Sequence, residues 1–215
     1  MKKQPAINDL LKVMAKLRSP KGCPWDREQT HRSLRSHAIE EVYELIDAIE
    51  AREDSEMAGE LGDLLMQVIF HCEIARERGA FDFEKVCALL TEKLIRRHPH
   101  VFGKTKVKNV DEVWVNWEKI KRAEKAGTKS ERKSAFDGIP KHLPALLRAE
   151  KLVKKAGNSN LMGKKSRREK ISGVRLGEKL FELAALAQAR GWNAEQLLGG
   201  EIKKQERTLR LRERR

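Results

Sequence analysis

Apolar residues recur at intervals of three and four along most of this chain, and this spacing constrains its fold more than any other feature. One run illustrates the pattern: Leu34, Ala38, Val42, Leu45, Ile46 and Ile49. Charged side chains occupy other positions of the same segment. An interval of three or four places side chains on one face of an α-helix, whereas a half-buried strand alternates at every second residue. Because strand signals are weak throughout, the sequence predicts an all-α fold.

Several segments share this spacing and are separated by glycine, proline or polar residues. They cover about residues 7–17, 31–51, 54–79, 82–97, 111–125, 144–156 and 176–190. We expect one helix in each segment, with Asp54 or Ser55 as the N-cap of the third. Pro99 ends the fourth helix, because the residue before a proline is pushed out of the helical region.

The composition of the chain changes at residues 126–143, which are rich in lysine, serine and glycine and contain Pro140. This composition is typical of a linker, so we predict a first domain at residues 1–125 and a second unit at residues 144–215. The second unit has few large apolar residues for a core of its own, and its segment 155–170 is polar and basic. We therefore expect the second unit to be partly disordered.

The positive charge of the chain is uneven along its 215 residues. Residues 1–139 carry a net charge of +2, whereas residues 140–215 carry +12. A separate basic segment is typical of contacts with nucleic acid or with an acidic partner. No apolar run approaches the length of a membrane-spanning helix, and three distant cysteines give no disulfide framework. We expect a cytoplasmic protein with no membrane partner.

Two acid clusters on consecutive predicted helices are the most informative feature of the sequence. The first reads EEVYE and contains Glu41 and Glu44, and the second reads ELGD and runs from Glu60 to Asp63. Residues three apart lie about 60° apart around a helix axis, so each cluster presents a pair of carboxylates on one face. Helices joined by a short turn pack antiparallel, so the two pairs can meet.

Converging carboxylates repel one another unless a cation lies between them. The segments 38–51 and 53–70 contain no lysine or arginine that could neutralise the two clusters. An all-oxygen ligand set suits Mg²⁺, with Mn²⁺ as a possible substitute, and bound Mg²⁺ commonly accompanies a phosphate substrate. The alternative is a solvated acidic face, which is the usual role of acids at helical spacing. The lack of nearby cations favours the metal site.

Residues suited to phosphate follow in the next two predicted helices. Lys93 and Arg97 lie one turn apart, and Trp117 and Lys121 have the same spacing. Ammonium and guanidinium groups bind phosphate oxygens, and an indole beside a lysine could serve a base and a phosphate. Taken alone, each pair also fits an ordinary solvated or core position. Because both pairs occur in the same chain as the acid clusters, we favour phosphate and base binding over these ordinary positions.

One internal similarity connects the two halves of the chain. The segments AGELGDLLMQVIF and SGVRLGEKLFELA share a small residue, a Leu-Gly pair and an apolar run. The second segment has Arg175 in place of Glu60 and Glu178 in place of Asp63. A duplicated unit is therefore possible, and its second copy has lost the acid pattern.

The ordered motifs resemble those of the MazG-type nucleoside triphosphate pyrophosphohydrolases. The resemblance rests on EExxE followed by ExxD, and on the segments GCPWDREQT, FDFEKVCALLTEKLIRRHPHVF, WEKIK and IPKHLPALLRAEK. It covers residues 7–156 almost continuously. The rest of the chain departs from bacterial two-domain members of the family, because no EExxE remains there.

This resemblance implies an all-α helical bundle that forms a dimer to complete its core. The implied activity is Mg²⁺-dependent hydrolysis of nucleoside and deoxynucleoside triphosphates to the monophosphate and pyrophosphate, with housecleaning of noncanonical nucleotides as one possible role. The implied metal ligands are Glu41, Glu44, Glu60 and Asp63, with Glu40 as an additional acid that orients or deprotonates water. The implied substrate contacts are Lys93, Arg97, Lys121, Trp117, Trp25, Asp26 and Gln29. Residues 144–215 are then a degenerate, metal-incompetent second unit.

The alternative function is a catalytically weak or inactive protein that binds nucleic acid or another protein through its basic C-terminal tail. It follows from the loss of the acid motif in the second unit, on which an ancestral activity could have depended. Release of pyrophosphate from nucleotides separates the two interpretations.

Overall fold

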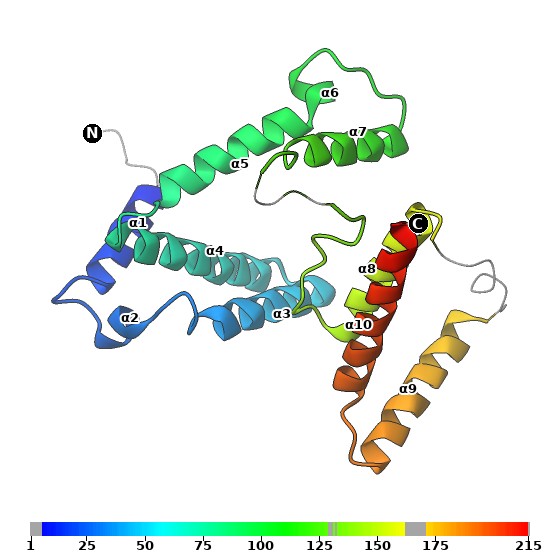
Figure 1. Cartoon of the computed structure of the whole chain (residues 1–215). Helices are drawn as coiled ribbons and strands as arrows, with labels where there is room; N and C mark the ends of the chain where they lie inside the picture. Colours follow the sequence, from blue (N-terminus) through cyan, green and yellow to red (C-terminus); the bar gives the residue numbers. More distant parts are fainter. Residues whose placement is uncertain (1–5, 129–130, 132, 162–170, 215) are drawn as a thin grey trace. The chain divides into compact units, whose positions relative to one another are not determined.

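A computed structural model of the chain describes residues 6–128, 131, 133–161 and 171–214. The described residues form helices, turns and loops but no strand, which confirms the all-α prediction (Figure 1). The helices are α1 (Ala6–Leu17), α2 (Pro24–Glu28), α3 (Arg35–Ala51), α4 (Asp54–Glu77), α5 (Phe83–Arg97), α6 (Pro99–Phe102), α7 (Val110–Ala123), α8 (Ala145–Asn158), α9 (Gly173–Ala189) and α10 (Ala194–Glu213).

Each helix expected from apolar spacing is present, and three further helices were not expected. Helices α2 and α6 are single short turns that begin at a proline, whose fixed φ suits the first helical position. Helix α10 has 20 residues, but the sequence predicts only a basic tail there. The predicted N-cap of α4 is wrong, because Glu53 occupies that position and Asp54 and Ser55 lie in the first turn.

The chain divides into two compact units, Met1–Val110 and Asp111–Arg215. This division groups α7 with the C-terminal helices, whereas the sequence suggests a boundary at the segment 126–143. The predicted functional domains, with a first domain ending at residue 125, remain a prediction.

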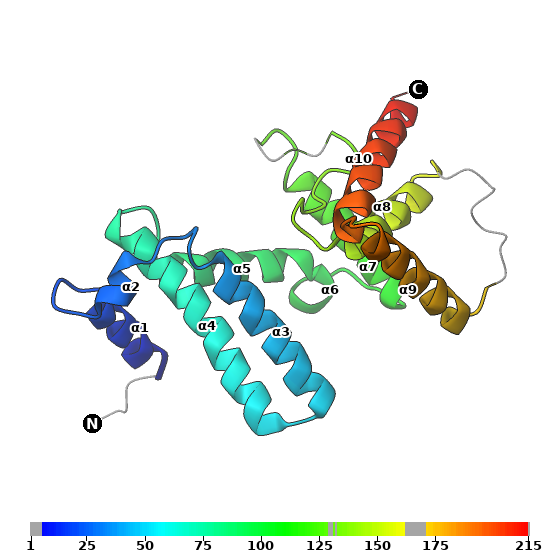
Figure 2. The ribbon, with the colours of Figure 1, turned by 90° about the horizontal axis from the view of Figure 1, so that it is seen from below.

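The first unit is built around the antiparallel pair α3 and α4, which lie side by side along their length (Figures 1 and 2). Arg52 has a left-handed backbone conformation with φ of 60° and donates its N–H to the carbonyls of Ala48 and Ile49, which ends α3. Helix α1 packs against α4. The core of this unit includes Met14 of α1, Ile69 and Phe70 of α4, and Leu34 at the start of α3. This packing fixes which face of α4 meets α3.

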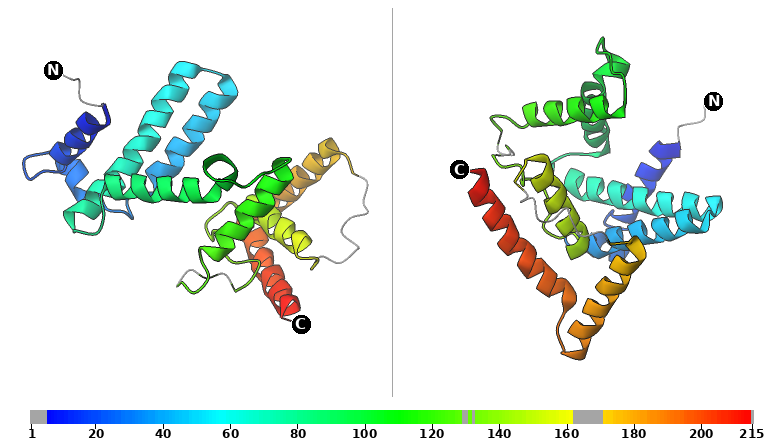
Figure 3. Two further views of the ribbon diagram at one scale, coloured as in Figure 1. Left: turned by 90° about the horizontal axis from the view of Figure 1, so that it is seen from above. Right: turned by 90° about the vertical axis from the view of Figure 1, so that its right-hand side faces the viewer.

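The second unit is built around α8 and α10, which pack against each other (Figure 3). Their core consists of Phe136, Ala145, Leu152, Ala156, Ile202 and Leu209. This half of the chain therefore buries a core of its own, although its sequence suggests few residues for one. Phe136 supplies the largest buried side chain of this cluster, and it comes from the segment with linker composition.

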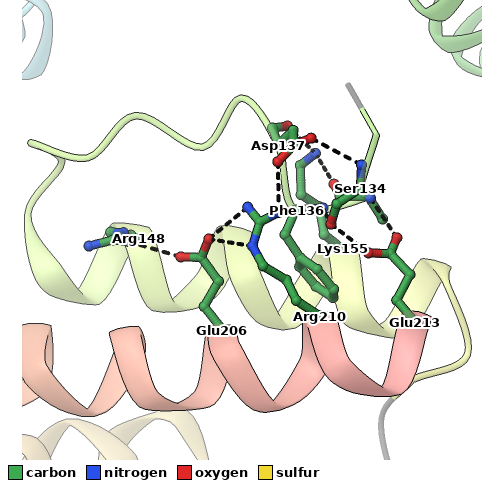
Figure 4. Close-up of polar contacts among 9 residues, drawn as sticks. Ser134, Phe136, Asp137, Arg148, Lys155, Glu206, Arg210 and Glu213 are labelled. Atoms are coloured by element: carbon green, nitrogen blue, oxygen red, sulfur yellow. Dashed lines mark hydrogen bonds and ion pairs between the residues drawn. The ribbon is translucent and has the colours of Figure 1, made fainter. Parts of the chain in front are cut away.

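Polar contacts anchor the segment around Phe136 to α8 and α10 (Figure 4). Arg210 donates to Asp137 at 2.7 Å, and Lys155 donates to the carbonyl of Asp137 at 3.2 Å. Glu213 accepts from the hydroxyl of Ser134 at 2.5 Å. The described part of the segment 126–143 is thus held in place. Part of the polar segment 155–170 is helical, contrary to the predicted disorder, because α8 continues to Asn158; residues 162–170 lie outside the described residues.

Candidate functional site

The structure brings three carboxylates together between α3 and α4. Glu41 projects from α3, and Glu60 and Asp63 project from α4 one turn apart. One carboxylate oxygen from each residue lies within 4.8 Å of the others. The antiparallel packing of the two helices produces this approach, because the turn at Arg52 folds one acid cluster back toward the other.

No cation in the described part of the chain neutralises the carboxylates of this cluster. Neither Glu41 nor Glu60 nor Asp63 forms an ion pair with any residue in the described part of the chain. Desolvation at the helix interface raises the pKa of Glu60 above its ordinary value, and the negative charges of Glu44, Asp63 and Glu41 raise this pKa further. The negative charges of these carboxylates therefore repel one another, and a bound cation would relieve this repulsion.

Two other acids of the EEVYE motif are placed differently. Glu44 is exposed on α3 and acts on Glu60 through its charge, but it is outside the three-residue cluster. Glu40 is exposed and lies 3.2 Å from His37 on the same helix. Glu44 therefore lies close enough to influence Glu60 electrostatically, whereas Glu40 contacts His37.

The donor set of the cluster fits a hard divalent cation. Three carboxylates from two rigid helices supply oxygen ligands and no nitrogen or sulfur, which suits Mg²⁺ or Mn²⁺ better than zinc. Oxygens bound to one Mg²⁺ lie at most about 4.2 Å apart, because each Mg–O distance is about 2.1 Å. Small side-chain adjustments would bring the observed oxygens within that range.

A buried amide on α4 contacts the cluster and was missed by the sequence analysis. Gln67 is 5% exposed, and its Nε2 donates a hydrogen bond to Oε1 of Glu41 at 3.2 Å. One turn further along α4, Nδ1 of His71 lies 2.9 Å from Nδ1 of His31. The sequence contains one signal of this arrangement, namely a glutamine in the otherwise apolar run LLMQVIF.

The predicted phosphate contacts of the first unit lie on α5. Lys93 and Arg97 are one turn apart near its C-terminal end, and both are partly buried. The sequence predicts their common face from the interval of four residues. Their role toward a phosphate remains a prediction.

The predicted nucleotide contacts around α2 form a small network before α3. The ring of Trp25 meets the edges of His37 and Phe70, with centroids 6.0 and 6.5 Å away. The backbone carbonyl of Asp26 accepts a hydrogen bond from Arg18. Gln29 accepts a hydrogen bond from Ser33 and donates one to the carbonyl of Trp25. Trp25 is half exposed, so an aromatic surface remains open.

The predicted pair on α7 is assembled as expected from its spacing, but it belongs to the second unit. Nζ of Lys121 lies 4.5 Å from the centroid of the Trp117 ring, and the same ammonium is 3.3 Å from Glu118. Trp117 also meets Trp114 edge to face, with centroids 5.8 Å apart.

The second copy of the ELGD pattern has a different environment on α9. Arg175 pairs with Glu178 at 2.8 Å and approaches Glu182 at 3.7 Å. The described part of the second unit contains no group of three potential metal ligands.

Within the described helices, none is both long enough and apolar enough to cross a membrane.

The sequence of the chain is similar to those of known proteins. Residues 29–102 match the MazG nucleotide pyrophosphohydrolase domain, a range that includes α3, α4 and α5. The chain is 49% identical over 154 residues to the nucleoside triphosphate pyrophosphohydrolase of Escherichia coli strain K12, which covers 71% of this chain and 57% of that protein. It is 50% identical over 150 residues to the nucleoside triphosphate pyrophosphohydrolase/pyrophosphatase MazG of Thermotoga maritima, covering 70% and 56%.

A third relative matches over more of both lengths. The chain is 38% identical over 192 residues to an uncharacterized 26.1 kDa protein of Streptomyces cacaoi, which covers 88% of this chain and 75% of that protein. By contrast, the chain spans little more than half the length of the two named enzymes that it matches.

Proposed function

The chain belongs to the MazG nucleotide pyrophosphohydrolase family, and from this premise we propose that it hydrolyses nucleoside triphosphates to nucleoside monophosphates and pyrophosphate. The named relatives from E. coli and T. maritima are nucleoside triphosphate pyrophosphohydrolases. Both nucleoside and deoxynucleoside triphosphates are candidate substrates, and housecleaning of noncanonical nucleotides is the biological role that we propose.

The observation that carries this proposal is the meeting of Glu41, Glu60 and Asp63 between α3 and α4. These residues, with Glu44 beside them, would hold Mg²⁺ or Mn²⁺. A divalent cation there would lower the pKa of the attacking water and offset the charge of the triphosphate. Glu40 would orient that water or accept its proton, which requires its carboxylate to leave His37.

Other residues of the chain would bind and orient the substrate. Lys93 and Arg97 would bind phosphate oxygens with an ammonium and a guanidinium. Trp25, whose ring is half exposed, would contact the nucleotide together with Asp26 and Gln29.

Trp117 and Lys121 on α7 are a further proposed substrate contact. The cation–π contact holds the indole ring of Trp117 and the ammonium of Lys121 together on one face of α7. In this role Trp117 would stack on the base and Lys121 would bind a phosphate oxygen. Domain boundaries at residues 125 and 144 would place both residues in the catalytic domain.

We also propose that the first unit forms a dimer. Large apolar side chains are exposed on α3 and α4: Ile39, Val42, Tyr43, Ile46, Ile49, Leu61, Leu65 and Val68. Their spacing of three and four places those of α3 on one face of that helix and those of α4 on one face of α4, and exposed apolar surface of this kind is typical of a protein interface. A second copy of the chain would cover it, and sedimentation equilibrium of the full chain measures the resulting mass.

Binding of nucleic acid or of an acidic protein through the basic C-terminal residues is a second candidate function. Residues 140–215 carry a net charge of +12, although Arg148, Arg175 and Arg210 are paired with acids. Contacts with nucleic acid phosphates would give an affinity that falls steeply with salt concentration. A filter-binding titration across salt concentrations measures this slope.

The enzyme proposal is tested by incubating the full chain with each NTP and dNTP in the presence of Mg²⁺ and measuring pyrophosphate. We expect release that the Glu41→Gln, Glu60→Gln double variant lacks. Both substitutions conserve shape while removing a ligand charge, so the variant is a matched control. Release equal to that of the control for every nucleotide would contradict the proposal.

A further inference from the structure

Gln67 occupies an unusual position on the face of α4 that meets α3. It is 5% exposed and lies in the same run of α4 as the core residues Ile69 and Phe70. An apolar side chain would be the ordinary occupant of such a position, because a buried polar group loses its hydrogen bonds to water. Among the described residues, its side chain has one hydrogen bond, from Nε2 to Oε1 of Glu41 at 3.2 Å.

The chemistry of the two groups fixes the orientation of this amide. An ionised carboxylate only accepts hydrogen bonds, so the NH₂ group of Gln67 faces Glu41 and its carbonyl oxygen faces away. Oε1 of Gln67 is then buried and has no hydrogen-bond partner among the residues that the structure describes. A buried acceptor without a partner costs stability. The core therefore gains little from Gln67, whereas the carboxylate cluster gains a donor.

We propose that Gln67 is a positioning residue for the divalent-cation site, and that it acts by holding the carboxylate of Glu41 toward Glu60 and Asp63. This inference rests on the proposed function, because it assumes that the cluster binds a cation. A donor fixed in a packed helix limits the rotation of Glu41, so less side-chain freedom is lost when a cation binds. Partners that orient metal ligands in this way typically change metal affinity by about 10- to 100-fold.

The substitution Gln67→Met separates this role from a structural one. Methionine has nearly the shape of glutamine but neither a donor nor an acceptor amide, so the variant loses both the hydrogen bond to Glu41 and the buried carbonyl without a partner. We expect the dissociation constant for Mn²⁺ to rise at least about tenfold. We also expect the thermal midpoint of the metal-free chain to stay the same or rise. A structural residue would show the reverse pattern.

The measurement is a titration of the full chain with Mn²⁺, read from the electron paramagnetic resonance of the free ion. His71→Phe is the matched control, because it removes a polar contact from the same face of α4 one turn away without touching Glu41. Its Mn²⁺ affinity should equal that of the parent chain. In a Glu41→Gln background, Gln67→Met should produce no further loss, because the residue acts through Glu41.

Three results would overturn the inference. One is an unchanged Mn²⁺ affinity in Gln67→Met when the parent chain binds the ion normally. Another is an equal loss of affinity in His71→Phe, which would indicate a general effect of packing between α3 and α4. The third is an absence of saturable Mn²⁺ binding by the parent chain, which would overturn the proposed function as well and is thereby distinguishable from the first two.

Discussion

Helices α4 and α9 carry related sequence patterns in contrasting surroundings. On α4, Glu60 and Asp63 face α3 and meet Glu41, and no described cation pairs with them. On α9, Arg175 stands where α4 has Glu60, and it pairs with Glu178 in the position of Asp63. The first pattern leaves negative charge for a ligand to balance, whereas the second is balanced within its own helix.

This difference shows that the pattern alone does not make a metal site. Helix α4 packs against α1, α3 and α5, and α3 supplies the opposing acid. Helix α9 packs principally against α10, and large apolar side chains such as Val174 and Phe181 remain exposed on it. Only 14 residues separate the end of α8 from the start of α9, fewer than the 17 residues of α3. Among the described residues of the second unit, no acids from a neighbouring helix gather with those of α9 into a group of three.

The largest expected difference between the two patterns is in catalysis. Asp63→Asn should lower pyrophosphate release by about a hundredfold, because it removes a charged ligand from the cluster. Glu178→Gln, the matched change on α9, should leave the rate unchanged. Steady-state rates with a saturating nucleotide and Mg²⁺ measure both. A similar loss of pyrophosphate release in both variants would contradict the proposal that α4, and not α9, carries the catalytic acids.

A smaller difference is expected in the pH dependence of stability without divalent cations. The folded state raises the pKa of Glu60 above the ordinary 4.5, so between 4.5 and the raised value the folded chain binds more protons than the unfolded chain. The contribution of Glu60 to the free energy of unfolding therefore falls as pH rises through this window. Glu60→Gln removes this contribution and should make the chain relatively more stable toward neutral pH.

Urea unfolding in EDTA at several pH values between 4.5 and 7 measures this dependence. Arg175→Gln is the control at the equivalent position of α9, and it should not alter the slope in this window. A stability difference between Glu60→Gln and the parent chain that does not change with pH would contradict the assignment of the raised pKa to Glu60.

The smallest expected effect is that of restoring an acid to α9. Arg175→Glu recreates the first acid of the pattern, but the described residues around α9 form no group of three potential metal ligands like the one between α3 and α4. It breaks exposed ion pairs with Glu178 and Glu182, so we expect a loss of at most about 1 kcal/mol in the free energy of unfolding. The number of bound Mn²⁺ ions should not change. An additional saturable site would show that the sequence pattern suffices without α3.

The sequence predicts the helices with wide apolar faces, and it fails where that signal is narrow. Helix α10 buries mainly Ile202 and Leu209, which are seven residues apart in a strongly charged segment. Such a stripe is too sparse to distinguish a packed helix from a basic tail. The burial of Phe136 likewise could not be predicted from the sequence. The contacts that fix its segment come from distant residues such as Arg210, which follows Asp137 by 73 positions.

The candidate site is predictable in part because its geometry follows from local rules. Glu60 and Asp63 share a helix face by their spacing, and a short turn brings α3 back along α4. The spacing cannot tell that Glu41 enters the cluster while Glu44 stays outside it, since both lie on one side of α3. Gln67 is unpredictable for a related reason, because its contact with Glu41 depends on the register between the two helices.

The most direct test is a calorimetric titration of the full chain with Mg²⁺. We expect saturable binding by the parent chain that is lost in the Glu41→Gln, Glu60→Gln double variant and retained in Glu178→Gln. Heat indistinguishable from dilution, with or without a non-hydrolysable nucleotide analogue, would contradict the account. Equal binding by the parent chain and the double variant would contradict it as well, because the ion would then be bound away from α3 and α4.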